Sequence, residues 1–241
     1  MRFKKLAIKN ASTLLLLVFI VIEISITLIY LQGLFSTGKA YPWFDMNGLR
    51  TIPSLLQSLQ LFLIGFISLS LLIVGRRSSL PPSQLFLLVI ALLFIYASVD
   101  ELFKIHLQLH KLSESVGNRD WMPVYLAVGV ATLTFFYRDF IALWYFQRRA
   151  ILFVALGMGI FVFGGFGAEV LKDILFQPLI SQRFEQGELV PFLLEKMRVA
   201  FEEFSEMLGQ SFTLYGIYLF VVKRFEKEPM TAMITEQEKC R

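Results

Sequence analysis

The sequence contains few of the cysteine, histidine and charged residues that are common in secreted and soluble proteins. Its 241 residues include one cysteine, Cys240, and two histidines, and only 17% of the residues are Asp, Glu, Lys or Arg. A single cysteine excludes a disulfide, a thiolate zinc site and CxxC redox chemistry within one chain. The low charge content is unusual for a soluble domain of this length.

Apolar residues take the place of the missing charges. Hydrophobic residues make up 56% of the chain and aromatic residues 15%, a composition typical of a small membrane bundle. A membrane-spanning helix needs about 20 mainly apolar residues, and stretches of this kind account for nearly the whole chain. We therefore predict an all-α integral membrane protein, a bundle of about six transmembrane helices forming one domain over residues 1–222. The predicted spans are 11–32, 53–75, 85–103, 122–137, 151–172 and 200–222, followed by a polar cytoplasmic tail, 223–241.

The basic residues indicate how the bundle is oriented. The formal net charge is +4, but Lys and Arg lie at the ends of apolar stretches, not as the stripe on one element that a nucleic-acid partner would favour. Because positive charge is retained in the cytoplasm, the distribution predicts that both termini lie inside, in a multi-pass protein of the cell membrane. The expected partners are the lipid bilayer and a membrane protein or a second copy of the chain, with no nucleic acid.

Several carboxylates lie inside the predicted spans, where lipid penalises them. An Asp at the centre of a membrane helix costs about 2.5 to 3.5 kcal/mol on insertion scales. At a rise of about 1.5 Å per residue, the acids of the third, fifth and sixth spans fall in one layer near the outer membrane boundary. Glutamines of the second span lie at a similar depth. The candidates for a proton, cation or metal site are Asp100, Glu101, Glu169, Glu202, Glu203 and Glu206, with Gln57 and Gln60 as weaker candidates.

Helical periodicity predicts which side chains face inward together. At about 100° per residue, the sixth span carries one polar, small-residue arc. Its members are Glu202, Glu206, Gly209, Gln210 and Thr213. On the third span, Lys104 aligns with Asp100 and could neutralise one carboxylate. On the fifth, Gly164 and Ala168 form an edge of small residues that permits close helix contact.

The same acids also allow a purely structural interpretation. In the headgroup region they would be hydrated and paired with Lys104, Lys172 or Arg198. Glu23 differs because it lies near the middle of the first span. That span is too long for the 7 to 15 residue core of a signal peptide, so we expect a retained helix. There Glu23 is either functional or a protonated carboxyl bonded to a neighbouring helix.

The two histidines, His106 and His110, lie four residues apart on an outer extension of the third span. Histidines at this spacing can chelate a metal when a carboxylate supplies a third ligand, so a divalent metal ion is a candidate cofactor. On an ideal helix, however, they point roughly 80 to 120° away from Asp100. A shared site would need a distorted helix or a carboxylate from another helix. Otherwise they are ordinary histidines of the outer surface.

Three motifs carry a resemblance. They are Ala97-Ser-Val-Asp-Glu-Leu-Phe-Lys-Ile-His106, Gly165-Phe-Gly-Ala-Glu169 and Phe201-Glu-Glu-Phe-Ser-Glu-Met-Leu-Gly209. Together they resemble a group of bacterial multi-pass membrane proteins of unknown function, although Leu107 stands where that group has an acid after the histidine. The resemblance implies a bacterial inner-membrane location and no particular activity.

Three functions are compatible with this pattern. The first is a transport or sensing protein whose carboxylate layer binds protons or a cation, because clustered carboxylates in a poorly hydrated site cannot all remain ionised without a positive partner. The second is a metal-dependent or acid/base membrane enzyme acting on a lipid-like substrate. The third is an assembly or scaffold subunit of a membrane complex, whose acids pair with the cations of a partner.

Overall fold

The computed structural model describes residues 2–75, 80–108, 121–172, 174 and 189–239, and within these ranges the chain is helical and forms no strand. The elements are α1 (Arg2–Thr37), the 3-10 helix η1 (Pro42–Phe44), α2 (Ile52–Val74), α3 (Gln84–Phe103), α4 (Ile105–Gln108), α5 (Trp121–Phe135), α6 (Tyr137–Ile160), the π-helix η3 (Phe161–Phe166), α7 (Gly167–Leu171) and α9 (Leu189–Lys239). The predicted all-α class is confirmed for the described residues.

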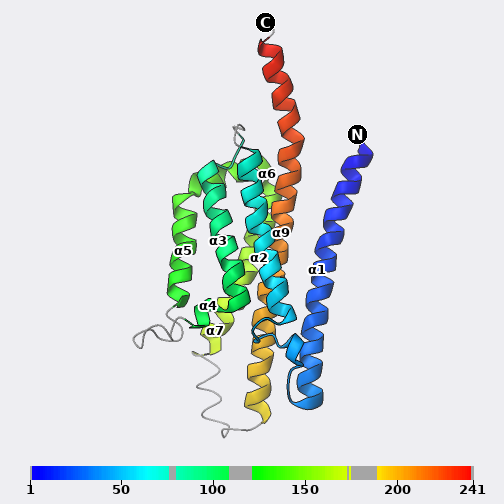
Figure 1. Ribbon diagram of the computed structural model, residues 1–241, viewed down its shortest axis with the longest axis vertical. Helices are drawn as coiled ribbons and strands as arrows, with labels where there is room; N and C mark the ends of the chain where they lie inside the picture. The colour runs from blue at the N-terminus through cyan, green and yellow to red at the C-terminus, as the bar shows by residue number, and fades with distance from the viewer. Residues whose placement is uncertain (1, 76–79, 109–120, 173, 175–188, 240–241) are drawn as a thin grey trace.

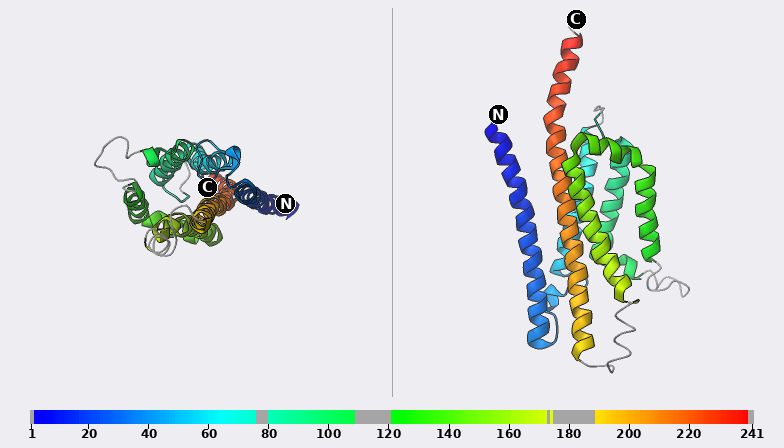
Figure 2. Two further views of the ribbon diagram at one scale, coloured as in Figure 1. Left: turned by 90° about the horizontal axis from the view of Figure 1, so that it is seen from below. Right: turned by 180° about the vertical axis from the view of Figure 1, so that it is seen from behind.

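The long helices lie side by side along one direction (Figure 1). The N- and C-termini lie at the same end of the bundle, which we call the terminal end, and α4 and α7 lie at the opposite end, the α4–α7 end (Figures 1 and 2). Helix α1 stands at one edge beside α9, and α5 stands at the other edge. Helix α9 runs through the whole bundle, so its two ends can take part in different sites.

Four helical stretches are long and apolar enough to cross a membrane. They are Thr13–Thr37, Ile52–Val74, Gln84–Phe103 and Tyr137–Phe166, and Trp121–Phe135 is a shorter apolar helix. Helix α9 begins at Leu189, before the predicted start at Ala200, and continues to Lys239. The polar tail therefore extends the last helix without a break.

Polar caps start the second and third helices. Thr51 and Ser54 form a reciprocal capping box at α2, in which the Thr51 N–H donates to Ser54 Oγ at 2.9 Å. Ser83 caps α3 by accepting from the Phe86 N–H at 3.2 Å. Between the two helices, Ser58 Oγ donates to the Ser98 carbonyl at 2.9 Å. These caps satisfy backbone donors that a helix start leaves open.

The charged residues that follow α5 lie in the first part of α6, which runs across the terminal end (Figure 2). Helix α5 ends at Phe135, and α6 starts at Tyr137 and kinks at Gln147 (φ −156°, ψ 82°). The stretch therefore continues into the fifth predicted span. Asp139 fixes it by accepting from the Ser83 N–H at 2.6 Å and from Ser83 Oγ at 3.0 Å.

Glycines set the contact between α6 and α9. A Cβ atom on Gly157 would lie 2.4 Å from the Gly209 carbonyl oxygen, and one on Gly216 would lie 2.7 Å from the Ala150 carbonyl oxygen. One on Gly164 would lie 2.2 Å from Ser205 Cβ. Backbones at this distance exclude any larger residue, so the small-residue edge predicted at Gly164 does face another helix.

Candidate functional site

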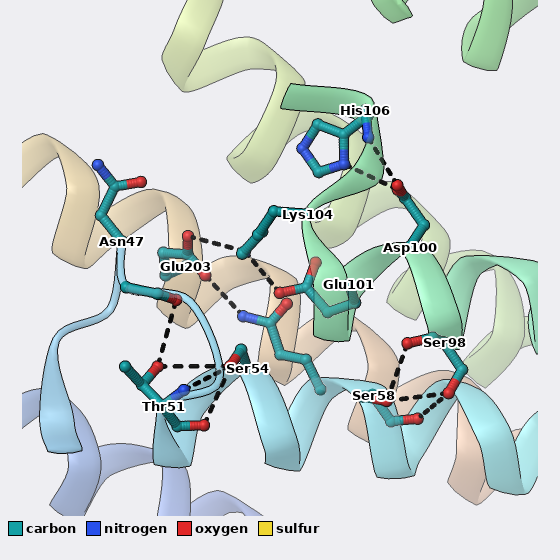
Figure 3. Close-up of polar contacts among 12 residues, drawn as sticks. Asn47, Thr51, Ser54, Ser58, Ser98, Asp100, Glu101, Lys104, His106 and Glu203 are labelled. Carbon is teal, nitrogen blue, oxygen red and sulfur yellow. Dashed lines mark hydrogen bonds and ion pairs between the residues drawn. The ribbon is translucent and has the colours of Figure 1, made fainter. Parts of the chain in front are cut away.

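The site begins with a break in the third helix. Lys104 has a left-handed backbone conformation (φ 47°, ψ 49°) and ends α3, a conformation that is uncommon for residues other than glycine. The chain then turns into α4, and this turn brings His106 back to Asp100 (Figure 3). The His106 N–H donates to Asp100 Oδ1 at 2.8 Å, and His106 Nδ1 lies 2.8 Å from Asp100 Oδ2. This is the distortion that an ideal helix would need for the two residues to meet.

Lys104 belongs to a network that joins three helices at the α4–α7 end. Its Nζ lies 2.6 Å from Glu101 Oε1 on the same helix and 3.7 Å from Glu203 Oε1 on α9 (Figure 3). From α2, Gln57 Nε2 donates to Glu203 Oε2 at 2.7 Å. All four side chains are buried. Lys104 thus pairs with Glu101 and lies near Glu203, and Asp100 has His106 as its partner.

A second group of ion pairs lies at the start of α9. Arg198 donates to Glu195 through Nη2 at 2.9 Å and also pairs with Glu202, while Lys172 Nζ lies 2.9 Å from Glu195 Oε1. Burial alone would raise the pKa of Glu195, but hydrogen bonds and charge from Arg198 and Lys172 outweigh it and lower the pKa to about 2. Lys172 and Arg198 thus have anionic partners already.

Glu206 is the exception in this network. Among the described residues it has no hydrogen bond or ion pair of its own, although Lys104 and the neighbouring glutamates act on it electrostatically. The π-helix η3 makes room for it, because a Cβ atom on Gly165 would lie 2.7 Å from Glu206 Oε1. π-Helical turns inside α-helices are frequent at functional sites. Glu206 therefore remains open to a ligand.

Most of these residues line a cavity of about 660 Å³ between α2, α3, α5, η3 and α9. Its acidic lining residues are Asp100, Glu101, Glu195, Glu202, Glu203 and Glu206, and its cationic ones are Lys104, Lys172 and Arg198, with His106 beside them. Six carboxylates against three permanent cations leave an excess of negative charge. The rest of the lining is largely apolar and includes Leu61, Ile64, Leu93, Phe94 and Val128.

Gln210 adds an unsatisfied polar group to this cavity. Its side chain is only 4% exposed, lines the cavity, and carries an Oε1 atom with no hydrogen-bond partner among the described residues. A buried acceptor without a donor costs about 1 to 3 kcal/mol.

Glu23 belongs to a separate network closer to the terminal end. It is fully buried, and its Oε1 accepts from Gln60 Nε2 at 2.9 Å and from Ser211 Oγ at 2.6 Å. Glu23 Oε2 and Gln60 Oε1 have no partner among the described residues. These contacts agree with the interpretation of Glu23 as a carboxyl bonded to neighbouring helices. Neither Glu23 nor Gln60 lines the cavity.

We expect Glu23→Leu to lower the free energy of unfolding by about 1 to 3 kcal/mol, because it removes the acceptor of both hydrogen bonds and leaves the buried Ser211 hydroxyl without one. Gln60 Nε2 still donates to Ser211 Oγ at 2.8 Å. Glu23→Gln keeps an acceptor oxygen of the same shape and should lose clearly less. Thermal unfolding in a mild detergent measures both variants. Equal losses would show that the hydrogen bonds to Gln60 and Ser211 do not hold the helices together.

The structure brings most of the sequence candidates together. Asp100, Glu101, Glu202, Glu203 and Glu206 meet at the α4–α7 end, joined by Lys104, His106 and Gln57. Glu169 lies in α7, but its side chain is outside the described residues, as is the whole of His110. Sequence reasoning missed Trp121, Tyr125 and Glu195 as lining residues, and it placed Gln210 on the right arc without giving it a role.

The donor arrangement offers no ready metal centre within the described ranges. No three or more His, Cys, Asp or Glu side chains there are grouped so that they could hold a metal ion. His106 is paired with one carboxylate instead. The predicted role of these residues toward a divalent metal ion stays a prediction.

Fold and site together define an all-helical protein with at least four apolar helices of membrane-spanning length and a charged cavity at one end. The chain belongs to the family described as Domain of unknown function (DUF8692), whose family model matches residues 3–222. The match includes every residue that lines the cavity. No curated protein and no solved structure matches the chain.

Proposed function

We propose that the chain is an integral membrane protein that crosses the cell membrane six times, through α1, α2, α3, α5, α6 with η3, and α9, with both termini in the cytoplasm. Four of these stretches have the length and hydropathy of spans, and α5 has no buried residue, as expected for a helix facing lipid. An even number of crossings agrees with termini at the same end (Figure 1). The resemblance in the motifs favours a bacterial inner membrane.

We further propose that the cavity binds protons or a cation, in a transport or sensing role. One observation carries this proposal: Glu206 faces the cavity without an ion-pair partner among the described residues, beside a surplus of carboxylates. In a poorly hydrated site an uncompensated carboxylate takes up either a proton or a positive ion. The charged groups around it are Glu202 and Glu203 on α9 and Glu101 and Lys104 at the end of α3.

The test is Glu206→Gln in protein reconstituted in a bilayer. The amide keeps the shape of the side chain and removes the charge, so we expect the change of melting temperature with pH and with added cations to be reduced. Glu226→Gln is the matched control, because Glu226 lies on the same helix near the terminal end and pairs with Lys223 at 3.7 Å. If Asp100, Glu202 and Glu206 are all replaced by their amides and the change of melting temperature with pH stays the same, the proposal is contradicted.

A second candidate, an acid/base membrane enzyme, is favoured by the Asp100–His106 pair. A carboxylate on Nδ1 orients an imidazole, and His106 lines the cavity. This candidate predicts turnover of a lipid-like substrate that Asp100→Asn and His106→Gln both abolish. Cation binding without turnover in the wild-type protein favours the first proposal.

A further inference from the structure

One wall of the cavity is aromatic. The Trp121 ring centroid lies 4.5 Å from that of His106, 5.5 Å from Tyr125 and 5.6 Å from Phe166. The Tyr125 hydroxyl is held by that of Tyr96 at 3.1 Å. All of these side chains line the cavity. Neighbouring rings from α5 and η3 therefore present a continuous π-surface to whatever the cavity contains.

The aromatic wall and the open carboxylate lie close together. Phe166 follows Gly165, the residue whose backbone contacts Glu206, and Trp121 packs on Phe166. Aromatic faces attract organic cations, and cages of Trp and Tyr recognise quaternary ammonium groups. Glu206, which lines the same cavity, supplies the counter-charge for such a group.

We propose that the ligand of the cavity is an amphiphilic organic ammonium ion, which rests on the cation-binding function proposed above. The ammonium group lies between Glu206 and the aromatic wall of Trp121, Tyr125 and Phe166. An alkyl chain extends along the apolar lining around Leu93 and Phe94. The shared chemistry is a cationic nitrogen on an apolar chain, in a free amphiphile or in a lipid headgroup.

Size and charge separate this ligand from the alternatives. The volume of about 660 Å³ falls within the roughly 300 to 1,000 Å³ of small-molecule sites and far exceeds what one inorganic ion fills. An anionic amphiphile would meet more carboxylates than cations, and the cations Lys104, Lys172 and Arg198 are already paired. An aromatic and apolar lining also suits an alkylammonium better than a strongly hydrated metal ion.

The test uses isothermal titration calorimetry on the full chain in nanodiscs of phosphatidylglycerol, a lipid that carries no ammonium group. We expect octyltrimethylammonium to bind saturably, one per chain. Tetramethylammonium should bind at least about tenfold more weakly because it lacks the apolar chain. Octyl sulfate, with the same chain and the opposite charge, should not bind. Equal binding of octyl sulfate, or no saturable binding of octyltrimethylammonium, would overturn the proposal.

Variants separate the failure of this inference from the failure of the proposed function. Trp121→Leu should weaken octyltrimethylammonium about tenfold, and a cooperative thermal unfolding transition shows that the variant is folded. Glu206→Gln should reduce both the affinity for octyltrimethylammonium and the pH response of the carboxylates. The matched control is Trp43→Leu, since Trp43 is 69% exposed and lies outside the cavity. If Trp121→Leu binds octyltrimethylammonium with full affinity, the aromatic site is refuted but the proposed function is not. If the pH response of Glu206→Gln is unchanged, the proposed function is refuted.

The lipid composition identifies the source of the ammonium group. Nanodiscs that contain phosphatidylethanolamine should weaken the apparent affinity for octyltrimethylammonium if an ammonium headgroup enters the cavity. An unchanged affinity assigns the site to free amphiphiles. Both results support an ammonium ligand, provided that the octyl sulfate arm remains negative.

Discussion

Lys104→Met is expected to lower the free energy of unfolding by about 3 to 5 kcal/mol, the usual cost of removing one member of a buried ion pair. Lys104 Nζ lies 2.6 Å from Glu101 and 3.7 Å from Glu203, and all three side chains are about 10% exposed or less. Methionine has a similar length and no charge, so it leaves two carboxylates in the same buried space. Thermal unfolding of the reconstituted protein measures the loss.

Two further variants identify charge as the cause of that loss. Lys223→Met removes a lysine whose side chain is 41% exposed and whose nearest carboxylate lies 3.7 Å away, so it should cost less than about 1 kcal/mol. Adding Glu101→Gln to Lys104→Met removes one of the stranded charges and should restore part of the stability. If the double variant is no more stable than Lys104→Met, the ion pair does not explain the loss.

The second large effect is expected at the crossing of α6 and α9. Gly157→Leu should cost about 3 kcal/mol or more, because its Cβ would lie 2.4 Å from the Gly209 carbonyl oxygen and the two backbones would have to separate. Since Glu206 lies one turn from Gly209, the displaced helix should also lose cation binding. Thermal unfolding and ligand titration on the same sample measure both effects.

Gly159→Leu is the matched control on the same helix. Apart from its chain neighbours and the backbone of its own helix, no atom lies within 4 Å of a Cβ built at Gly159, so the same substitution meets open space two residues away. There we expect no loss, and a gain of about 0.5 to 1 kcal/mol is expected from replacing a helical glycine. A similar loss at both positions would show that glycine acts through helix propensity and not through the close contact.

The sequence was sufficient to predict the helical class and the layer of carboxylates, because both depend on local patterns. Apolar length and helical periodicity placed Asp100, Glu202 and Glu206 at one end of their helices, where the structure brings them together. The pairs that these side chains form with one another could not be predicted in the same way. The left-handed Lys104 and the π-helix η3 break the 100° periodicity that the prediction assumed.

Those two irregularities decide the detailed chemistry of the site. The turn at Lys104 pairs His106 with Asp100, although an ideal helix points them apart. The π-helix opposes Gly165 to Glu206, and no spacing rule in the sequence indicates it. Trp121 lies just before the fourth predicted span, and its contact with Phe166 depends on tertiary packing between two elements far apart in the sequence.

The most direct test of the central claim is an infrared difference spectrum of the protein in a bilayer, recorded with and without octyltrimethylammonium and compared with Glu206→Gln. The account predicts that ligand binding changes a carboxyl band in the wild-type protein, and that this change is absent in Glu206→Gln and retained in Glu226→Gln. A ligand-induced carboxyl signal that persists unchanged in Glu206→Gln, or no carboxyl signal at saturating ligand, would contradict it.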